Sequence, residues 1–101
     1  MAEVIVAFDM ARAADALKLA DRLPGLRWAK VGPVAFLDGG PPLVAGFRQR
    51  GVQVFLDFKW HDIPNTVGEA VAGAERVGAA LVTVHALGGD AMIRAAVAAR
   101  R

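Results

Sequence analysis

Four apolar runs recur along the sequence, and each is followed by a stretch of helical character. The apolar runs cover residues 4–8, 27–31, 52–58 and 80–86. The helical stretches follow at residues 11–23, 41–51, 66–78 and 90–101. Strands that alternate with helices predict a parallel sheet with right-handed crossovers. Runs this apolar are typical of strands that are covered on both faces.

Local signals predict where the helices begin. Pro41 and Pro42 suit the first turn of a helix, where a missing backbone N–H costs nothing. The spacing of Thr66 and Glu69 fits a capping box. Asp90 follows two glycines and is the expected N-cap of the last helix.

Four β-α units within 101 residues predict a fold class rather than a complete fold. A closed (β/α)₈ barrel takes about 250 residues, so one reading is an α/β chain with parallel strands that forms a (β/α)₄ half of a TIM barrel. The other reading is a small, open, doubly wound sheet. In either case residues 1–101 form a single partial domain with unpaired edge strands. Such edges indicate a part of something larger, or pairing with another copy.

Composition and charge exclude several classes of protein. The formal charge is only +2 and the basic residues are scattered, so the sequence does not predict nucleic-acid binding. No apolar run approaches the ~20 residues that span a membrane, and no basic leader precedes the first strand. We therefore expect a cytoplasmic protein without a membrane partner. The sequence lacks cysteine and serine, which excludes disulfides and a serine nucleophile.

Polar residues gather near the carboxyl ends of the four predicted strands. Asp9 ends the first, Lys30 the second, Asp57 and Lys59 the third, and His85 the fourth. Taken singly, each has an ordinary structural role. Asp9 suits a helix N-cap, and Lys30 suits a side chain whose stem packs on a helix. His85 suits a hydrogen-bonded core histidine, and Asp57 with Lys59 suits a structural ion pair. Together they lie at the end of the sheet where α/β folds build their active sites.

The third strand and the loop after it offer the most chemistry. With Lys30, residues Asp57, Lys59 and Asp62 supply two cations and two carboxylates, although Asp62 can also simply begin a turn before Pro64. A lysine between two carboxylates stays protonated, so it can deliver a proton or stabilise a developing carbanion. The set suits an anionic, carbanion-forming substrate and needs no organic cofactor.

A metal site is the competing interpretation of the same region. Asp57, His61, Asp62 and His85 could supply oxygen and nitrogen ligands to a divalent cation. Two lysines in the same cluster argue against a cation there. We therefore expect no metal.

The segment "DFKWHDIPNT" at residues 57–66 resembles the signature of the orotidine 5'-phosphate decarboxylase family. The segments "VAFD" at 6–9, "KVG" at 30–32 and "TVHALGG" at 83–89 resemble the ends of the first, second and fourth barrel strands of that family. The resemblance covers essentially the whole chain. It implies the conversion of orotidine 5'-monophosphate to UMP and CO₂, without metal or cofactor.

The resemblance also implies roles for individual residues. Lys59 would protonate the carbon that CO₂ leaves, and Asp57 would face the substrate carboxylate. Lys30 and Asp62 would complete the charge network, and Asp9 and Lys30 would bind the ribose. How Asp57 contributes, by electrostatic stress or by organising Lys59, stays open.

In this family the active enzyme is a homodimer with shared active sites. The resemblance implies that Asp62, Ile63 and Thr66 reach into the site of the neighbouring subunit. It also implies that residues from later strands hold the phosphate, so the 101-residue chain alone is expected to be inactive. Two alternatives remain: a sugar-phosphate decarboxylase or synthase of the same barrel group, and a non-catalytic half-barrel that self-associates.

Overall fold

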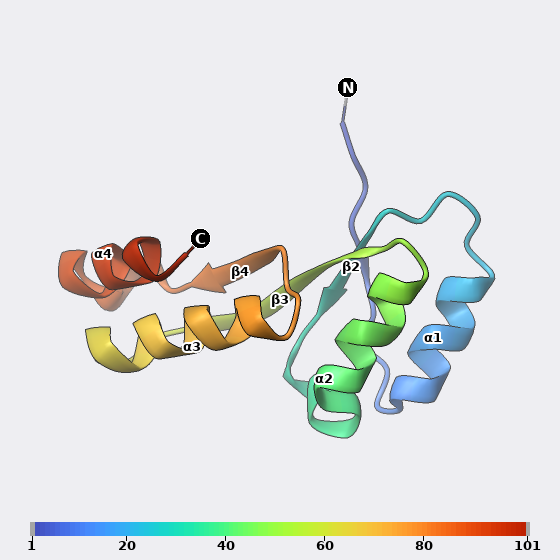
Figure 1. Cartoon of the computed structure of the whole chain (residues 1–101), viewed down its shortest axis with the longest axis horizontal. Coiled ribbons are helices and arrows are strands. Elements are labelled where there is room, and N and C mark those ends of the chain that lie inside the picture. The colour runs from blue at the N-terminus through green and yellow to red at the C-terminus, as the bar shows by residue number, and fades with distance from the viewer. Residues whose placement is uncertain (1, 101) are drawn as a thin grey trace.

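The computed structural model describes residues 2–100 as four parallel strands that alternate with four helices (Figure 1). The strands are β1 (Val6–Ala7), β2 (Trp28–Val31), β3 (Gln53–Trp60) and β4 (Leu81–Val84). The helices are α1 (Ala13–Asp21), α2 (Pro33–Gln49), α3 (Pro64–Arg76) and α4 (Asp90–Ala99), with a 3₁₀ turn η1 (Ala86–Gly88) before the last. The sheet order is β1-β2-β3-β4. The predicted half-barrel arrangement is confirmed.

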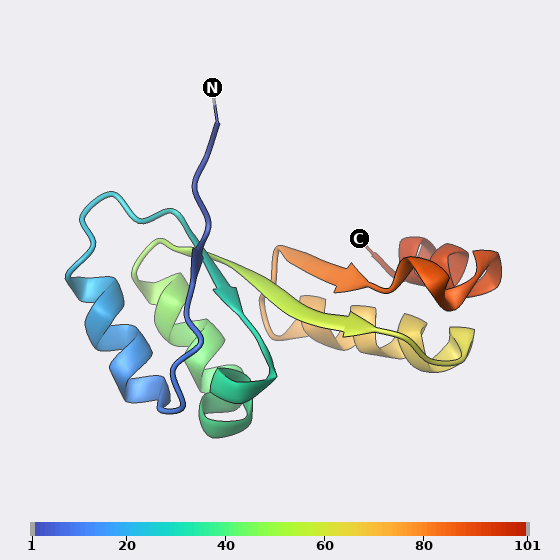
Figure 2. The ribbon, with the colours of Figure 1, turned by 180° about the vertical axis from the view of Figure 1, so that it is seen from behind.

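The sheet has one face covered by helices and one face open, and alternate residues of the central strands point to each. Ala29, Val31, Val54 and Leu56 are buried beneath the helices, which lie behind the strands in Figure 2. The residues between them, such as Lys30, are partly exposed. The prediction that both faces are covered is therefore wrong for the described residues. The open face is the one that a closed barrel would turn inward.

Two clusters of buried side chains hold the helices against the sheet. The larger cluster joins β1, β2 and β3 to α1 and α2, with the rings of Phe8 and Phe47 meeting edge to face at a centroid distance of 4.9 Å. The smaller cluster includes Val67 and Met92 and joins α3 to α4. The long strand β3 runs from the α1–α2 pair out along the α3–α4 pair in Figure 1. Among residues 2–100, no helix has the length and apolar character needed to cross a bilayer.

The start of α1 is fixed by a contact between helices. Arg12 occupies the N-cap position without a side-chain hydrogen bond, and Asp9 lies before the helix, so the N-cap role considered for Asp9 is wrong. The Ala13 amide instead donates to Oδ2 of Asp38 at 2.7 Å. Asp38 belongs to α2, and it therefore satisfies one of the amides that the first turn of α1 leaves unpaired.

The other helix starts also differ from the predictions by a few residues. Helix α3 begins at Pro64 with Ile63 as its N-cap, so Thr66 lies inside the first turn and the predicted capping box is wrong. Helix α4 begins at Asp90, and its N-cap is Gly89. Helix α2 begins at Pro33 rather than Pro41, and it is kinked at Gly40, where φ is +57°. The prolines at 41 and 42 start only its second half.

Gly39 allows α2 to approach α1 closely. A Cβ atom there would lie 2.5 Å from Cβ of Ala13 and 2.7 Å from Cβ of Leu43, so the helices would have to move. We expect Gly39→Ala to lower the free energy of unfolding of the 101-residue chain by about 1–3 kcal/mol in urea denaturation. Gly68→Ala is the matched control, because its Cβ would meet Ala95 at an ordinary 3.6 Å. Equal effects of the two substitutions would contradict this account.

Candidate active site

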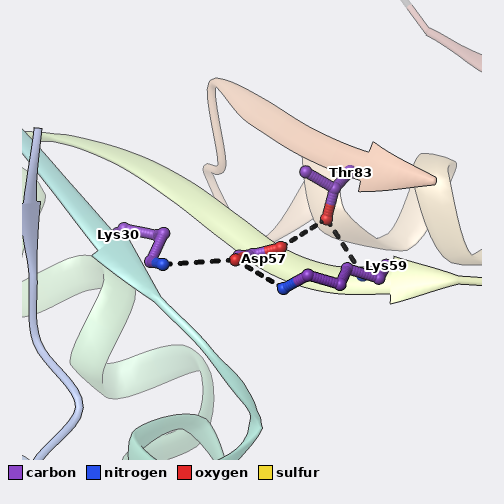
Figure 3. A network of polar contacts seen from close by, with 4 residues as sticks. All are labelled: Lys30, Asp57, Lys59 and Thr83. Carbon is purple, nitrogen blue, oxygen red and sulfur yellow. Dashed lines mark hydrogen bonds and ion pairs between the residues drawn. The ribbon is translucent and has the colours of Figure 1, made fainter. Parts of the chain in front are cut away.

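A single buried carboxylate organises the polar end of the sheet. Asp57 lies on the open face of β3, and its side chain is only 9% exposed. Its Oδ2 atom accepts from Nζ of Lys59 at 2.9 Å and lies 3.4 Å from Nζ of Lys30 (Figure 3). Its Oδ1 atom accepts from the hydroxyl of Thr83 at 2.7 Å. Three neighbouring strands therefore contribute to one network.

The backbone of β3 is irregular where it carries this network. The parallel ladder with β4 shifts register between Leu56 and Trp60. Within the shift, Lys59 has φ of +50°, the only positive φ among the non-glycine residues of the described chain. A lysine rarely adopts this conformation. The Lys59 amide is held by a hydrogen bond of 2.9 Å to Oγ1 of Thr83.

The surroundings of Asp57 favour its ionised form. The hydrogen bond from Lys59 lowers the pKa of the Asp57 carboxyl most, and the hydrogen bond from Thr83 and the nearness of Lys30 lower it further. Burial opposes these effects but does not reverse them. At neutral pH the network therefore contains a negative charge beside two ammonium groups.

The lowered pKa predicts a pH-dependent contribution to stability. A carboxylate whose pKa is lower in the folded than in the unfolded state stabilises the fold above its unfolded pKa, and this stabilisation disappears as the pH falls through its folded pKa. We expect the difference in unfolding free energy between wild type and Asp57→Asn to shrink as the pH falls from about 7 to about 2. Urea denaturation of the 101-residue chain measures it. A difference that stays constant with pH would contradict the assignment.

The network is arranged differently from the sequence prediction. The sequence predicted an ammonium group between two carboxylates, whereas the described residues place one carboxylate between two ammonium groups. Asp62 instead turns back on its own loop, where Oδ1 accepts from the Ile63 amide at 2.7 Å. This matches the turn-forming role considered for Asp62.

The other candidate residues lie around this network without contacting it. Asp9 follows β1 and is exposed, and the Phe8 amide donates to the carbonyl of Lys30, so the ends of β1 and β2 lie together. Ile63 is 64% exposed, and Thr66 is exposed on the first turn of α3. The site therefore has an inner charge network and an outer, solvent-facing loop.

The residues considered for a metal site have other arrangements. The rings of His61 and His85 stack with centroids 4.8 Å apart, and Nδ1 of His85 accepts from the Leu87 amide at 3.2 Å. Asp57 is occupied by the two lysines and Thr83. Among residues 2–100, no group of three or more His, Cys, Asp or Glu side chains could hold a metal ion. The described residues therefore offer no ligand set for the metal interpretation.

Thr83 is the member of the network that the candidate residues did not include. Its place on the same strand face as His85, two residues earlier, was the available signal, because alternate residues of a strand share a face. A threonine within an apolar strand is nevertheless ordinary. Only the register of β3 against β4 shows that its hydroxyl meets Asp57.

Comparison with known proteins identifies the family of the chain. Residues 2–101 match the family model described as "Orotidine 5'-phosphate decarboxylase / HUMPS family". The chain belongs to this family. Its relatives include proteins named orotidine 5'-phosphate decarboxylase from Alkalilimnicola ehrlichii, 53% identical over 94 residues, and from Parasynechococcus marenigrum, 48% identical over 96 residues.

The matches of this family member cover nearly the whole chain but only part of each relative. They span 92% of the chain and 40% of the Alkalilimnicola protein, and 95% of the chain and 39% of the Parasynechococcus protein. A solved structure of an uncharacterized conserved protein from Geobacillus kaustophilus superposes with a TM-score of 0.87 at 43% identity, covering 94% of this chain and 45% of that one. The chain thus spans about two fifths of the curated relatives' length.

Proposed function

We propose that this chain supplies the charge network of an orotidine 5'-monophosphate decarboxylase, which releases CO₂ to give UMP without metal or cofactor. The observation that carries the proposal is the ionised carboxylate of Asp57 between the ammonium groups of Lys59 and Lys30, at the carboxyl end of parallel strands. Active sites in barrels of this kind are built at that end. The names of the relatives favour orotidylate over a sugar phosphate as the substrate.

The chemistry assigns one role to each member of the network. The bond between the pyrimidine ring and the carboxylate carbon breaks, and its electron pair stays on the ring carbon. The Lys59 ammonium, whose side chain is 67% exposed, stabilises that charge and donates the proton that replaces CO₂. Asp57 holds the Lys59 head in place and holds the Lys30 ammonium beside it, because a carboxylate shared by two cations attracts both of them.

The outer residues suit substrate binding and contact with a second copy. Asp9 and Lys30 bind the ribose in this proposal, since β1 and β2 end side by side. The exposed positions of Asp62, Ile63 and Thr66 leave them able to enter the site of a partner subunit. The working enzyme is then a cytoplasmic homodimer with shared sites. Burial of Ile63, now 64% exposed, would favour that contact.

A chimeric enzyme tests the proposal. Residues 1–101 replace the matching segment of the Alkalilimnicola relative, to which the chain is 53% identical over 94 residues. Decarboxylation of orotidine 5'-monophosphate, followed by ultraviolet absorbance, is expected at a rate close to that of the relative and insensitive to EDTA. A folded chimera that is inactive on this substrate refutes the proposal. Turnover of a hexulose phosphate with loss on EDTA treatment supports the sugar-phosphate alternative.

The 101-residue chain alone is expected to show no turnover. It spans about two fifths of the relatives' length, so the remainder of a barrel is not supplied by this segment. Size-exclusion mass and the same absorbance assay, run on one sample, check this expectation. An associated but inactive species fits the self-associating half-barrel, whereas measurable turnover would show that the charge network suffices.

A further inference from the structure

Thr83 stands opposite the irregular part of β3. The ladder pairs Leu56 with Val82 and next pairs Trp60 with Val84, so β3 advances four residues while β4 advances two. The extra residues form a bulge, and a bulge removes regular ladder partners from the residues within it. Asp57 and Lys59 both lie in this bulge. Thr83 is the single β4 residue between the two paired positions.

The Thr83 hydroxyl takes the place of the missing ladder partner. It accepts from the Lys59 amide at 2.9 Å and donates to Oδ1 of Asp57 at 2.7 Å. The direction of both bonds is fixed, because an ionised carboxylate only accepts and a backbone amide only donates. Oγ1 carries a single proton, so it donates to Asp57 and uses a lone pair for Lys59. Only a side chain that both donates and accepts can replace it.

The two bonds of the Thr83 hydroxyl act on two parts of the charge network, the Asp57 carboxylate and the Lys59 backbone. One bond occupies Oδ1 of Asp57 and leaves Oδ2 to both ammonium groups, as Figure 3 shows. The other bond holds the Lys59 backbone at φ of +50°, which costs energy for a residue with a side chain and persists only where the surroundings enforce it. Strained backbone at this point sets where the Lys59 side chain leaves the strand.

We infer that Thr83 is a positioning residue of the site: its hydroxyl holds the Asp57 carboxylate and the left-handed Lys59 backbone in the arrangement that presents the Lys59 ammonium group. The inference deepens the proposed function, on which the need for that ammonium rests. The hydroxyl's part in the geometry can nevertheless be measured without any turnover.

Carbon-13 NMR of the Asp57 carboxyl in the 101-residue chain is the first test. Thr83→Val keeps the shape of the side chain but removes both bonds, so the pKa of Asp57 is expected to rise relative to wild type. Thr83→Ser retains the hydroxyl and is expected to leave that pKa low. The Asp21 carboxyl, bound to Arg50 elsewhere in the fold, serves as the internal control and is expected not to change. An unchanged Asp57 titration in Thr83→Val overturns the inference.

Hydrogen exchange in the unaltered chain provides a test that does not depend on a variant folding. The Lys59 amide is expected to exchange at least about tenfold more slowly than an unstructured amide, since it is hydrogen-bonded to Thr83. Exchange at the unstructured rate overturns the inference.

The chimeric enzyme adds a kinetic test. Thr83→Val is expected to lower kcat by about tenfold with little change in KM, and Thr83→Ser to restore it. An unchanged kcat in Thr83→Val would limit Thr83 to a structural role and overturn the inference. Should the chimera itself lack activity, the proposed function fails, while the titration and exchange measurements still decide the role of Thr83.

Discussion

Replacing Lys59 with alanine in the chimeric decarboxylase should reduce kcat/KM by about 10²- to 10⁴-fold, the range that a lost general acid typically costs. The side chain reaches from a buried carboxylate towards solvent on the open face of the sheet, and among residues 2–100 no second ammonium is placed to do the same. Lys30 is only 32% exposed and approaches Asp57 from the neighbouring strand. It is therefore not positioned to replace Lys59. Steady-state absorbance assays measure the loss.

A matched lysine separates loss of chemistry from loss of structure. Lys18 is exposed on α1 and is not part of the network, so Lys18→Ala should keep wild-type turnover. Circular dichroism and urea denaturation of both variants should show an unchanged fold. If the Lys59→Ala enzyme turned over at the rate of the Lys18→Ala control, Lys59 could not be the proton donor.

The sequence was sufficient to predict the strands and the end of the sheet that carries the charges. Apolar runs mark the strands because each must bury at least one face, as Val31 and Leu56 do here. The order of the strands then follows from short right-handed crossovers. Parallel strands in this order place Lys30 beside β3, with Ala29 and Val31 paired to Val54 and Leu56. The contact between Lys30 and Asp57 follows directly from that register.

The helix starts could not be predicted because tertiary contacts determine them. The amide of Ala13 is satisfied by Asp38, 25 residues away, and no local pattern reports such a partner. Local capping signals compete with one another, and Pro64 began α3 ahead of the cap expected at Thr66. These errors of a few residues leave the strand ends, and therefore the site, in place.

The bulge in β3 is the part of the site that the sequence conceals. Regular alternation along a strand already places Asp57 and Lys59 on one face, so their spacing gives no sign of an irregularity. The sequence does not indicate that Lys59 has a left-handed backbone. The loop after Trp60 is equally hidden in the sequence, because there Asp62 accepts a hydrogen bond from the Ile63 amide instead of joining Lys59. The pattern of charges thus predicted that Lys30 and Lys59 meet Asp57, but it missed Thr83 and wrongly added Asp62.

Replacing Asp57 with asparagine in the chimera should lower kcat by about 10²- to 10³-fold, as expected when a preorganised electrostatic partner is removed. Asparagine has nearly the same shape, and its carbonyl oxygen can still accept from the Thr83 hydroxyl, so the substitution removes mainly the charge. Lys59 and Lys30 then face each other without the carboxylate that they share. Asp21→Asn, which disrupts the ion pair with Arg50 elsewhere, is the control and should leave kcat unchanged.

The KM of the Asp57→Asn enzyme distinguishes two explanations of the same loss. If Asp57 acted by repelling the substrate carboxylate, removing its charge would relieve that repulsion, and KM would fall together with kcat. In the structure the charge is already shared by two ammonium groups and a hydroxyl, which leaves little to repel a substrate. We therefore expect kcat to fall while KM stays the same or rises. A clear decrease in KM would mean that electrostatic stress, rather than the organisation of Lys59, is what Asp57 contributes.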